Sequence, residues 1–306
     1  MRKWIPLIIV GSVLMGVSAY WFYTRPYNAA RLVEMLPPDR SVHVYIDVGL
    51  LRQAGVLDLL AGNKAQEDPD YKKFVEESGF DYRKDLDALA VAFRDGDVYY
   101  AARGRFTWSK LEAYAPAHKG KCDRFLCTAP GTEKGRDVSY YMPRSDVLAI
   151  ATSRTATAGD MVAPGSWQAP PRIPATAGVW ISAPPFAFTD LSKVAPGTRP
   201  FLSPLTQAVA TTFALGPAPT GGAFQLKMQV TTRNPDAATK MVKQFSEVTD
   251  LLVKMIAREN MTPSQSDLSG VLVAGRFEAK DTEVTGTWPI SKAFVESLAS
   301  TVDLKK

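Results

Sequence analysis

The chain begins with a long uncharged segment that restricts where everything after it can fold. The run from Trp4 to Tyr23 contains no Asp, Glu, Lys or Arg, and Lys3 and Arg25 lie just outside it. One helix needs roughly 20 apolar residues to cross the hydrocarbon core of a bilayer. Aromatic rings gather at both ends of the run, where membrane interfaces favour them. The sequence therefore predicts a transmembrane signal-anchor over residues 1–25, in contact with the lipid bilayer.

The charges beside this segment predict its orientation. Arg2 and Lys3 precede the apolar run, and positive residues that flank a first span usually remain cytoplasmic. We therefore expect a cytoplasmic N-terminus and an extracytoplasmic body, in the periplasm or at the cell surface. The alternative is a signal peptide cleaved near the small residues Val17-Ser18-Ala19, which would release a secreted protein. Both alternatives export the rest of the chain.

The charge of the exported part argues against nucleic acid as a partner. The formal net charge of the chain is +5, and leaving out Arg2 and Lys3 gives 5 − 2 = +3 for the exported part. Nucleic-acid-binding surfaces concentrate Lys and Arg, whereas here the small excess is spread over a long chain. The densest basic stretch, His118 to Lys121 with Arg124, is more typical of a solvated turn than of an anion site.

The chain has two cysteines, Cys122 and Cys127. In an exported protein a close pair of this kind favours a disulfide. A zinc site takes about four ligands, and the chain offers only two histidines to complete one. A bridge that closes so short a loop removes little entropy from the unfolded chain, so we expect it to fix the local turn.

Several patterns in the exported part predict individual elements. Val42 to Asp47 alternates and is rich in β-branched residues, which indicates a strand. Leu86 to Phe93 and Val98 to Ala102 flank Asp95-Gly96-Asp97, which indicates a hairpin. Asn234-Pro235 can provide the N-cap and first residue of the longest helix.

Other expectations concern the ends and faces of elements. The apolar residues of the long helix predict one buried stripe, formed by Met241, Phe245, Val248, Leu252 and Met255. Ser109-Lys110-Leu111-Glu112 matches a capping box that would open a helix through Ala117. Arg124 to Cys127 and Val271 to Phe277 are expected to be strands, and Pro289 to Ser300 a closing helix.

The order of elements is repeated along the chain. Residues 163–176 are rich in proline, which can neither continue a helix nor donate to a sheet, and they indicate a linker. It separates a first α+β module at 26–162 from a second at 177–306. The predicted fold is therefore α+β: a duplicated module of mainly antiparallel sheet with helices packed on one face. The alternative is a single domain whose halves are alike by chance.

A stretch near the start of the exported part resembles a known group of proteins. The resemblance rests on Leu36-Pro37-Pro38-Asp39, on Val44-Tyr45-Ile46-Asp47 with Leu50, and on Gly79-Phe80-Asp81 with Asp85-Leu86-Asp87. These residues resemble the opening of uncharacterised bacterial envelope proteins that join an N-terminal anchor to repeated α+β domains. The resemblance implies an envelope protein of unknown function and assigns no catalytic residue.

No residue pattern predicts a catalytic, cofactor or metal site. A serine hydrolase needs a histidine base, and His43 lies within a predicted strand, while Gly165-Ser166 lacks the pattern of a nucleophile elbow. The acidic residues Asp81, Asp85 and Asp87 lie among Arg83 and Lys84 and are interpreted as a solvated, mutually neutralised turn, although paired carboxylates could support glycoside hydrolysis. Four tryptophans could line a groove for a glycan or peptide, although aromatic residues in strands more often lie in a core: Trp108, Trp167, Trp180 and Trp288.

These observations favour a non-enzymatic protein of the bacterial envelope, anchored in the membrane and binding or scaffolding another envelope protein or polymer. The alternative hypothesis is an exported hydrolase that acts on cell-wall or polysaccharide substrates through carboxylates. No cofactor is expected.

Overall fold

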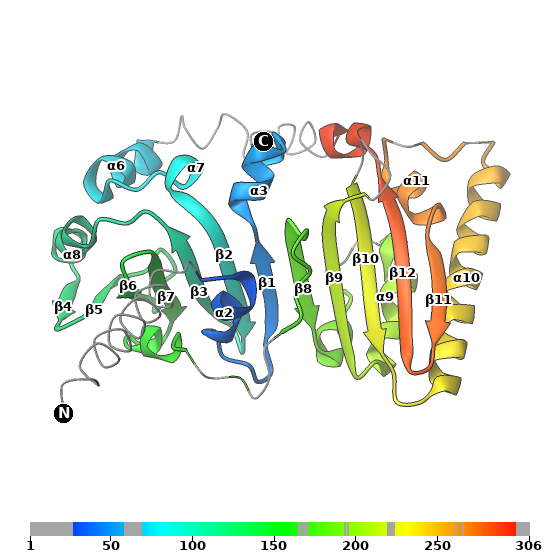
Figure 1. The fold of residues 1–306 in the computed structure, drawn as a ribbon, viewed down its shortest axis with the longest axis horizontal. Helices are drawn as coiled ribbons and strands as arrows, with labels where there is room; N and C mark the ends of the chain where they lie inside the picture. The colour runs from blue at the N-terminus through cyan, green and yellow to red at the C-terminus, as the bar shows by residue number, and fades with distance from the viewer. Residues whose placement is uncertain are drawn as a thin grey trace, which may run out of the picture.

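The computed structural model describes residues 27–57, 69–164, 167, 171–192, 194, 196–218, 224–260, 262–264 and 266–297. The predicted span from Trp4 to Tyr23 lies outside these residues. Within the described part, no helix is both long and apolar enough to cross a bilayer. A single 12-stranded antiparallel sheet runs the length of the molecule (Figure 1). The predicted α+β class with mainly antiparallel pairing is confirmed.

The first half of the sheet contains seven strands. In spatial order from the centre they are β1 (Val42–Ile46), β2 (Leu86–Arg94), β3 (Asp97–Gly104), β7 (Val147–Ser153), β6 (Asp137–Arg144), β5 (Leu126–Pro130) and β4 (Lys121–Asp123). The predicted hairpin joins β2 to β3. Its turn residues Asp95 and Gly96 both have positive φ, at 49° and 88°, which matches the right-handed twist of the flanking strands.

The second half of the sheet begins at β8, which pairs with β1. Outward from the centre its strands are β8 (Val179–Ala183), β9 (Ala210–Pro217), β10 (Phe224–Thr231), β12 (Glu283–Ile290) and β11 (Arg276–Lys280). In the central antiparallel pair, Val44 lies opposite Ile181 and Tyr45 opposite Trp180. Hydrogen bonds therefore continue across the boundary that the sequence predicts between two modules.

The two halves have the same strand order outward from the centre. The order β1-β2-β3-β7-β6 in one half corresponds to β8-β9-β10-β12-β11 in the other, and the β4–β5 hairpin extends the first half alone. That these halves are duplicated modules which superpose remains a prediction.

Helices cover the two faces of the sheet unequally. On one face, here called the α2 face, Leu32, Val33 and Met35 of α2 (Ala29–Glu34) pack on inward-facing residues of β1, β2, β3 and β7. On the opposite α10 face, α8 (Trp108–Ala117) covers the first half through Leu111 and Ala115. The prediction that helices lie on one face is therefore wrong for the first half. The reason is that its central strands are apolar on both faces, so both faces must be covered.

The α10 face of the second half carries the larger core. It is covered by α3 (Val48–Gln53), α9 (Arg199–Leu202), α10 (Pro235–Arg258) and α11 (Leu268–Val273). In the first half, α6 (Pro69–Ser78) lies beside α8, and α7 (Tyr82–Asp85) leads directly into β2 (Figure 1).

The long helix begins as the sequence predicts. The side chain of Asn234 accepts a hydrogen bond of 2.8 Å from the backbone N–H of Ala237, and Pro235 is the first helical residue. Met241 and Phe245 are buried, but Met255 is 53% exposed and Ile256 is buried instead. At about 100° per residue, Ile256 returns to within about 20° of the direction of Phe245, whereas Met255 is turned away by about 80°.

Further expectations are wrong at the level of single elements. Val271–Phe277 is not a strand: α11 ends at Val273 and β11 begins at Arg276. Short apolar runs do not distinguish helix from strand, and the Asp267 side chain caps α11 by accepting from Gly270 N–H.

The predicted strand from Arg124 to Cys127 is wrong at its start, because Arg124 and Phe125 form the turn between β4 and β5. The capping box predicted to begin at Ser109 is also wrong: the N-cap of α8 is Thr107, and Ser109 lies inside the helix. The closing helix begins later than the predicted Pro289, because Pro289 lies in β12; it is described from residue 292 to residue 297.

The packing of α10 gives a stability prediction. Phe245 is 1% exposed and its ring stacks on Phe277 at a centroid distance of 4.9 Å, so Phe245→Ala is expected to cost about 3 to 5 kcal/mol of unfolding free energy. Leu251 on the same helix is 58% exposed, so Leu251→Ala should change it by less than about 0.5 kcal/mol. Urea denaturation measures both variants, and equal losses would contradict this placement of the helix.

Candidate functional site

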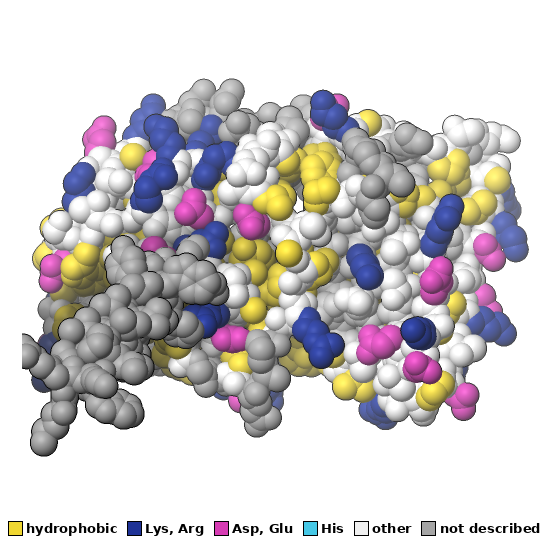
Figure 2. All heavy atoms as spheres, viewed as in Figure 1, with side chains coloured by type: hydrophobic (Ala, Val, Ile, Leu, Met, Phe, Trp, Pro, Cys, Tyr) yellow, Lys and Arg dark blue, Asp and Glu magenta, His cyan; other side chains and the backbone are white. Residues whose placement is uncertain are grey.

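The α2 face of the second half is a sheet surface without a covering helix among the described residues. Along β9, β10 and β12, side chains on this face are mostly polar, while their neighbours in sequence point into the core: Thr212, Gln225, Lys227, Gln229, Thr231, Glu283, Thr285 and Thr287. Figure 2 shows polar and scattered charged side chains over these strands. Because side chains alternate along each strand, one face of the sheet packs in the core and the other is accessible to a ligand.

A groove of about 540 Å³ is hollowed into this surface beside the centre of the sheet. Its floor comes from the four strands β8, β9, β10 and β12, and its wall from residues on either side of the 168–170 segment. The lining residues are Trp167, Pro171, Arg172, Trp180, Ser182, Ala210, Thr212, Gln229, Thr231 and Glu283. We call this feature the polar groove. Its volume lies within the range of about 300–1,000 Å³ typical of ligand pockets.

Trp167 connects the wall of the polar groove to the first half of the fold. Its indole Nε1–H donates a 3.0 Å hydrogen bond to the carbonyl of Leu36, and its ring lies 4.8 Å from the ring of His43. His43 in turn uses Nε2 to donate a 2.9 Å hydrogen bond to the carbonyl of Pro37. His43 is buried at 2% exposure, and this burial lowers its pKa despite the opposing effect of the Pro37 hydrogen bond. Burial therefore favours the neutral form of His43, and its ring packs against Trp167 of the groove wall.

The groove is polar with little net charge. Its described lining contains one cation, Arg172, and one anion, Glu283. An oxygen of Glu283 accepts a 2.9 Å hydrogen bond from the hydroxyl of Thr231. The other polar groups of the described lining are hydroxyls and the amide of Gln229, which can each donate and accept, and the indole N–H groups of the two tryptophans, which only donate. Such a lining suits a neutral ligand with many hydroxyl or amide groups.

A second hollow, of about 600 Å³, adjoins the first by sharing Pro171 and Arg172. Asp47 lies in it, but one carboxylate oxygen caps α3 by accepting from Leu50 N–H at 2.8 Å. The other oxygen accepts from the hydroxyl of Tyr45 at 3.3 Å. Burial, followed by the charge of Asp47, raises the pKa of the Tyr45 phenol, so that hydroxyl stays protonated. These groups maintain the fold around the hollow.

The acidic residues considered for hydrolysis lie elsewhere, around α7. Asp81 caps α7 by accepting from Arg83 N–H at 3.0 Å, and it also accepts from Tyr71 at 2.9 Å. Burial alone would raise the pKa of Asp81, but these hydrogen bonds and one with Lys84 give a net lowering. Asp85 pairs with Arg105 at 3.0 Å. Asp81 and Asp85 are thus engaged in caps and ion pairs, whereas Asp87, which the sequence groups with them, lies in β2.

The other candidates from the sequence are dispersed. His118 ends α8 and lies 2.6 Å from a carboxylate oxygen of Glu77. Trp108 packs edge-to-face against Tyr140, and Trp288 lies in the core on the α10 face. Of the four tryptophans, only Trp167 and Trp180 line the polar groove. Gly165 and Ser166 lie outside the described residues.

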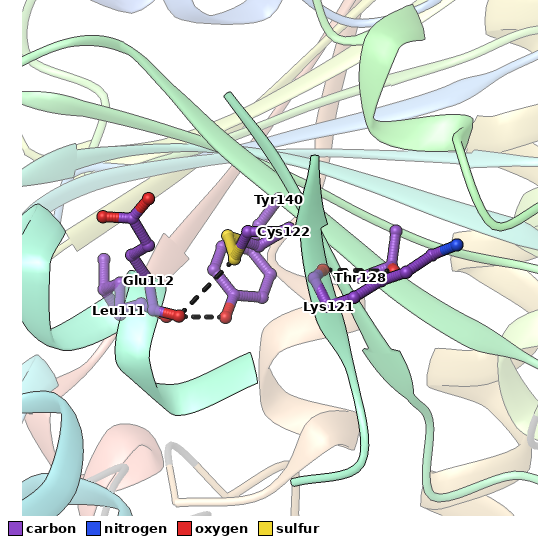
Figure 3. The surroundings of a disulfide bond; sticks show 7 residues. Leu111, Glu112, Lys121, Cys122, Thr128 and Tyr140 are labelled. Atoms are coloured by element: carbon purple, nitrogen blue, oxygen red, sulfur yellow. Dashed lines mark hydrogen bonds between the residues drawn. A yellow bond between two sulfur atoms is a disulfide. The ribbon is translucent and has the colours of Figure 1, made fainter. Parts of the chain in front are cut away.

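The predicted disulfide between Cys122 and Cys127 is present and joins β4 directly to β5 (Figure 3). Cys127 is fully buried and belongs to the cluster beneath α8. Cys122 Sγ lies 3.5 Å from the carbonyl oxygen of Glu112, a van der Waals contact because a disulfide sulfur carries no hydrogen. Nearby, Tyr140 donates a 2.7 Å hydrogen bond to the carbonyl of Leu111. The two cysteines are 5 positions apart. Closing a loop of this length restricts the unfolded chain and thereby stabilises the folded state by roughly 2 kcal/mol.

The sequence did not identify the strand residues that form the groove floor. Thr212, Gln229, Thr231 and Glu283 carry no motif, and they are separated by up to 71 positions (283 − 212). A signal was nevertheless present, because polar residues alternate with core residues along each of these strands. Only the pairing of β9, β10 and β12 shows that their polar faces form one surface.

Comparisons with known proteins give no family. No protein-family model matches the chain, and no curated protein matches it in sequence. Crystal form I of TP0453 is similar over 92% of this chain and 98% of that chain, with 12% identity and a TM-score of 0.46. Crystal form III of TP0453 is similar over 91% and 98%, with 11% identity and a TM-score of 0.45.

The buried histidine gives a pH prediction. An unfolded histidine has a pKa of about 6.5, and the folded value is lower, so the unfolded chain binds the proton more tightly. His43 therefore lowers the unfolding free energy as the pH falls below about 6.5, by at most about 1.4 kcal/mol per pH unit. His43→Gln keeps an N–H donor for Pro37 but cannot ionise. We expect a shallower loss of stability between pH 7.5 and 5.5 in this variant, measured by urea denaturation at each pH. Identical slopes would show that His43 does not titrate as its burial implies.

Proposed function

We propose that this chain is a non-enzymatic binding module of the bacterial cell envelope, held outside the cytoplasm by its N-terminal anchor. Its ligand is a polar polymer of the envelope, most simply a glycan strand, bound in the polar groove. The observation that carries the proposal is the uncovered polar sheet face with a groove hollowed into it. Hydroxyl and amide groups from the three strands β8, β9 and β10 meet there around the Arg172 guanidinium and the Glu283 carboxylate of β12.

The position of the groove supports this proposal. Its wall comes from the predicted linker at 163–176 and its floor from the predicted second module at 177–306. Trp167 ties that wall to Leu36 and His43 in the predicted first module. Ligand pockets commonly lie where two structural units meet, because neither unit alone closes both sides. A duplicated pair of modules around a linker would place the site at such a junction.

The predicted location supports the same ligand class. The apolar run Trp4 to Tyr23, preceded by Arg2 and Lys3, would leave the N-terminus cytoplasmic and export the body. The disulfide between Cys122 and Cys127 suits an oxidising compartment. A groove with one cation and one anion is suited to a neutral polymer rather than to nucleic acid.

The hydrolase alternative has less support from the geometry. Glycoside hydrolysis uses two carboxyl groups about 5 to 10 Å apart around the scissile bond. The described lining of the polar groove contains one carboxylate, Glu283. In the adjoining hollow, both oxygens of Asp47 are engaged by Leu50 and Tyr45. Binding without hydrolysis is therefore the function we propose.

Fractionation of cells that express the full chain tests the proposed location. We expect the protein in the membrane fraction with Met1 to Tyr23 intact, because the apolar run is long enough to remain in the bilayer. In spheroplasts, added protease should degrade the body while cytoplasmic marker proteins survive. A mature N-terminus near Ala19 would establish the secreted alternative, and a soluble protein with an intact N-terminus would refute both.

Co-sedimentation with purified cell-wall glycan tests the groove. In Gln229→Trp a large ring would occupy the groove from an exposed position on β10, and we expect at least a tenfold loss of affinity. Gln225→Trp is the matched control, because Gln225 lies on the same strand and face but outside the groove lining. Equal binding by both folded variants, or no binding by the wild-type chain, would contradict the proposed ligand site.

A further inference from the structure

We propose that the α10 face contains a second ligand site, which binds a single acyl chain between the sheet and its helices. This site goes beyond the function proposed above and does not depend on it. It consists of two adjoining pockets of about 350 Å³ and 230 Å³. Leu226, Ile290 and Phe294 line both pockets. We call the pair the apolar channel.

The channel is formed by elements that are far apart in the sequence. The larger pocket lies between the sheet and the helices α9 and α11, with Phe201 and Leu272 among its lining residues. The smaller pocket lies between the same sheet and α3, with Leu51 and Val56 among its lining residues. Phe294, from the closing helical turn, borders both.

The channel follows the direction of the strands. On β10, Phe224 lines the smaller pocket, Leu226 lines both, and Met228 lines the larger one. Alternate residues of a strand share a face, and the four steps from Phe224 to Met228 cover roughly 13 Å at about 3.3 Å each. Leu215 and Phe213 line the two pockets in the same order on the neighbouring strand β9. An elongated space of this kind fits a linear chain better than a compact ring system.

The lining chemistry offers water few hydrogen-bond partners and favours hydrocarbon. Among the described residues that line the larger pocket, Thr198 and the indole of Trp288 carry the polar side-chain groups. The described lining of the smaller pocket contains no side chain with a hydroxyl, amide or charge. A buried water needs about two to four polar partners. Unfilled space in an interior also forfeits dispersion contacts that close packing would provide. A methylene chain can restore these contacts and requires no hydrogen bond along its length.

A displacement assay on the full chain, purified in digitonin, tests the acyl site with cis-parinaric acid as the fluorescent probe and palmitate as the competitor. We expect saturable binding by the wild-type chain. Leu226→Trp should weaken it at least tenfold, because Leu226 borders both pockets. Val253→Trp is the matched control, since Val253 is 43% exposed on α10 and lines neither pocket.

Further variants keep the test decisive. If Leu226→Trp fails to fold, Leu50→Trp narrows the smaller pocket from a half-buried position and should weaken binding as well. Gln229→Trp, which obstructs the polar groove on the opposite face, should bind the probe normally, so the two proposed sites can fail separately.

Native mass spectrometry of the purified chain distinguishes a retained fatty acid from a retained phospholipid by mass. Absence of saturable binding in the wild type, or equal binding by folded Leu226→Trp and Val253→Trp, would overturn the proposal.

Discussion

The antiparallel pairing of β1 with β8 is the interaction on which the rest of the structure depends. Without it the chain would form two separate sheets, each with an exposed edge of unpaired N–H and C=O groups. The register sets Tyr45 opposite Trp180 and His43 opposite Ser182 on the α2 face. Cross-strand aromatic pairs of this kind stabilise a sheet beyond the backbone hydrogen bonds. The pairing also brings Trp180 to the centre of the molecule, where it becomes part of the polar groove.

The two faces of the second half differ because side chains alternate along each strand. On β10, Leu226 and Met228 belong to the core on the α10 face, while Gln225, Lys227 and Gln229 lie on the opposite face. One strand thus contributes to both proposed sites, an apolar channel beneath helices and a polar groove open to solvent. A register slip by one residue would exchange these surfaces and bury the polar residues. The two proposed ligand chemistries therefore follow from a single alternating pattern.

Much of the fold could be predicted because its signals are local. The Asp95-Gly96 turn needs positive φ at both positions, and Asn234 with Pro235 meets the requirements of a helix start. The errors arise where local signals are ambiguous. Val271 to Phe277 is apolar enough for a strand, but tertiary packing and the Asp267 cap make its first part a helix. Met255 follows the predicted spacing, yet helical geometry turns it toward solvent.

The sequence alone determined the α+β class, the antiparallel hairpins and the position of the disulfide, because each depends on residues close together in the chain. It also supplies the predicted anchor at Trp4 to Tyr23, from the length of an uncharged run. Only the tertiary structure decided where the candidate sites lie. Trp167, Thr212 and Glu283 lie in separate segments, and no local pattern shows that they meet. Long-range strand pairing and the contact of Trp167 with His43 bring these segments onto one surface. Such contacts depend on register and packing across the whole sheet, which periodicity within one segment does not specify.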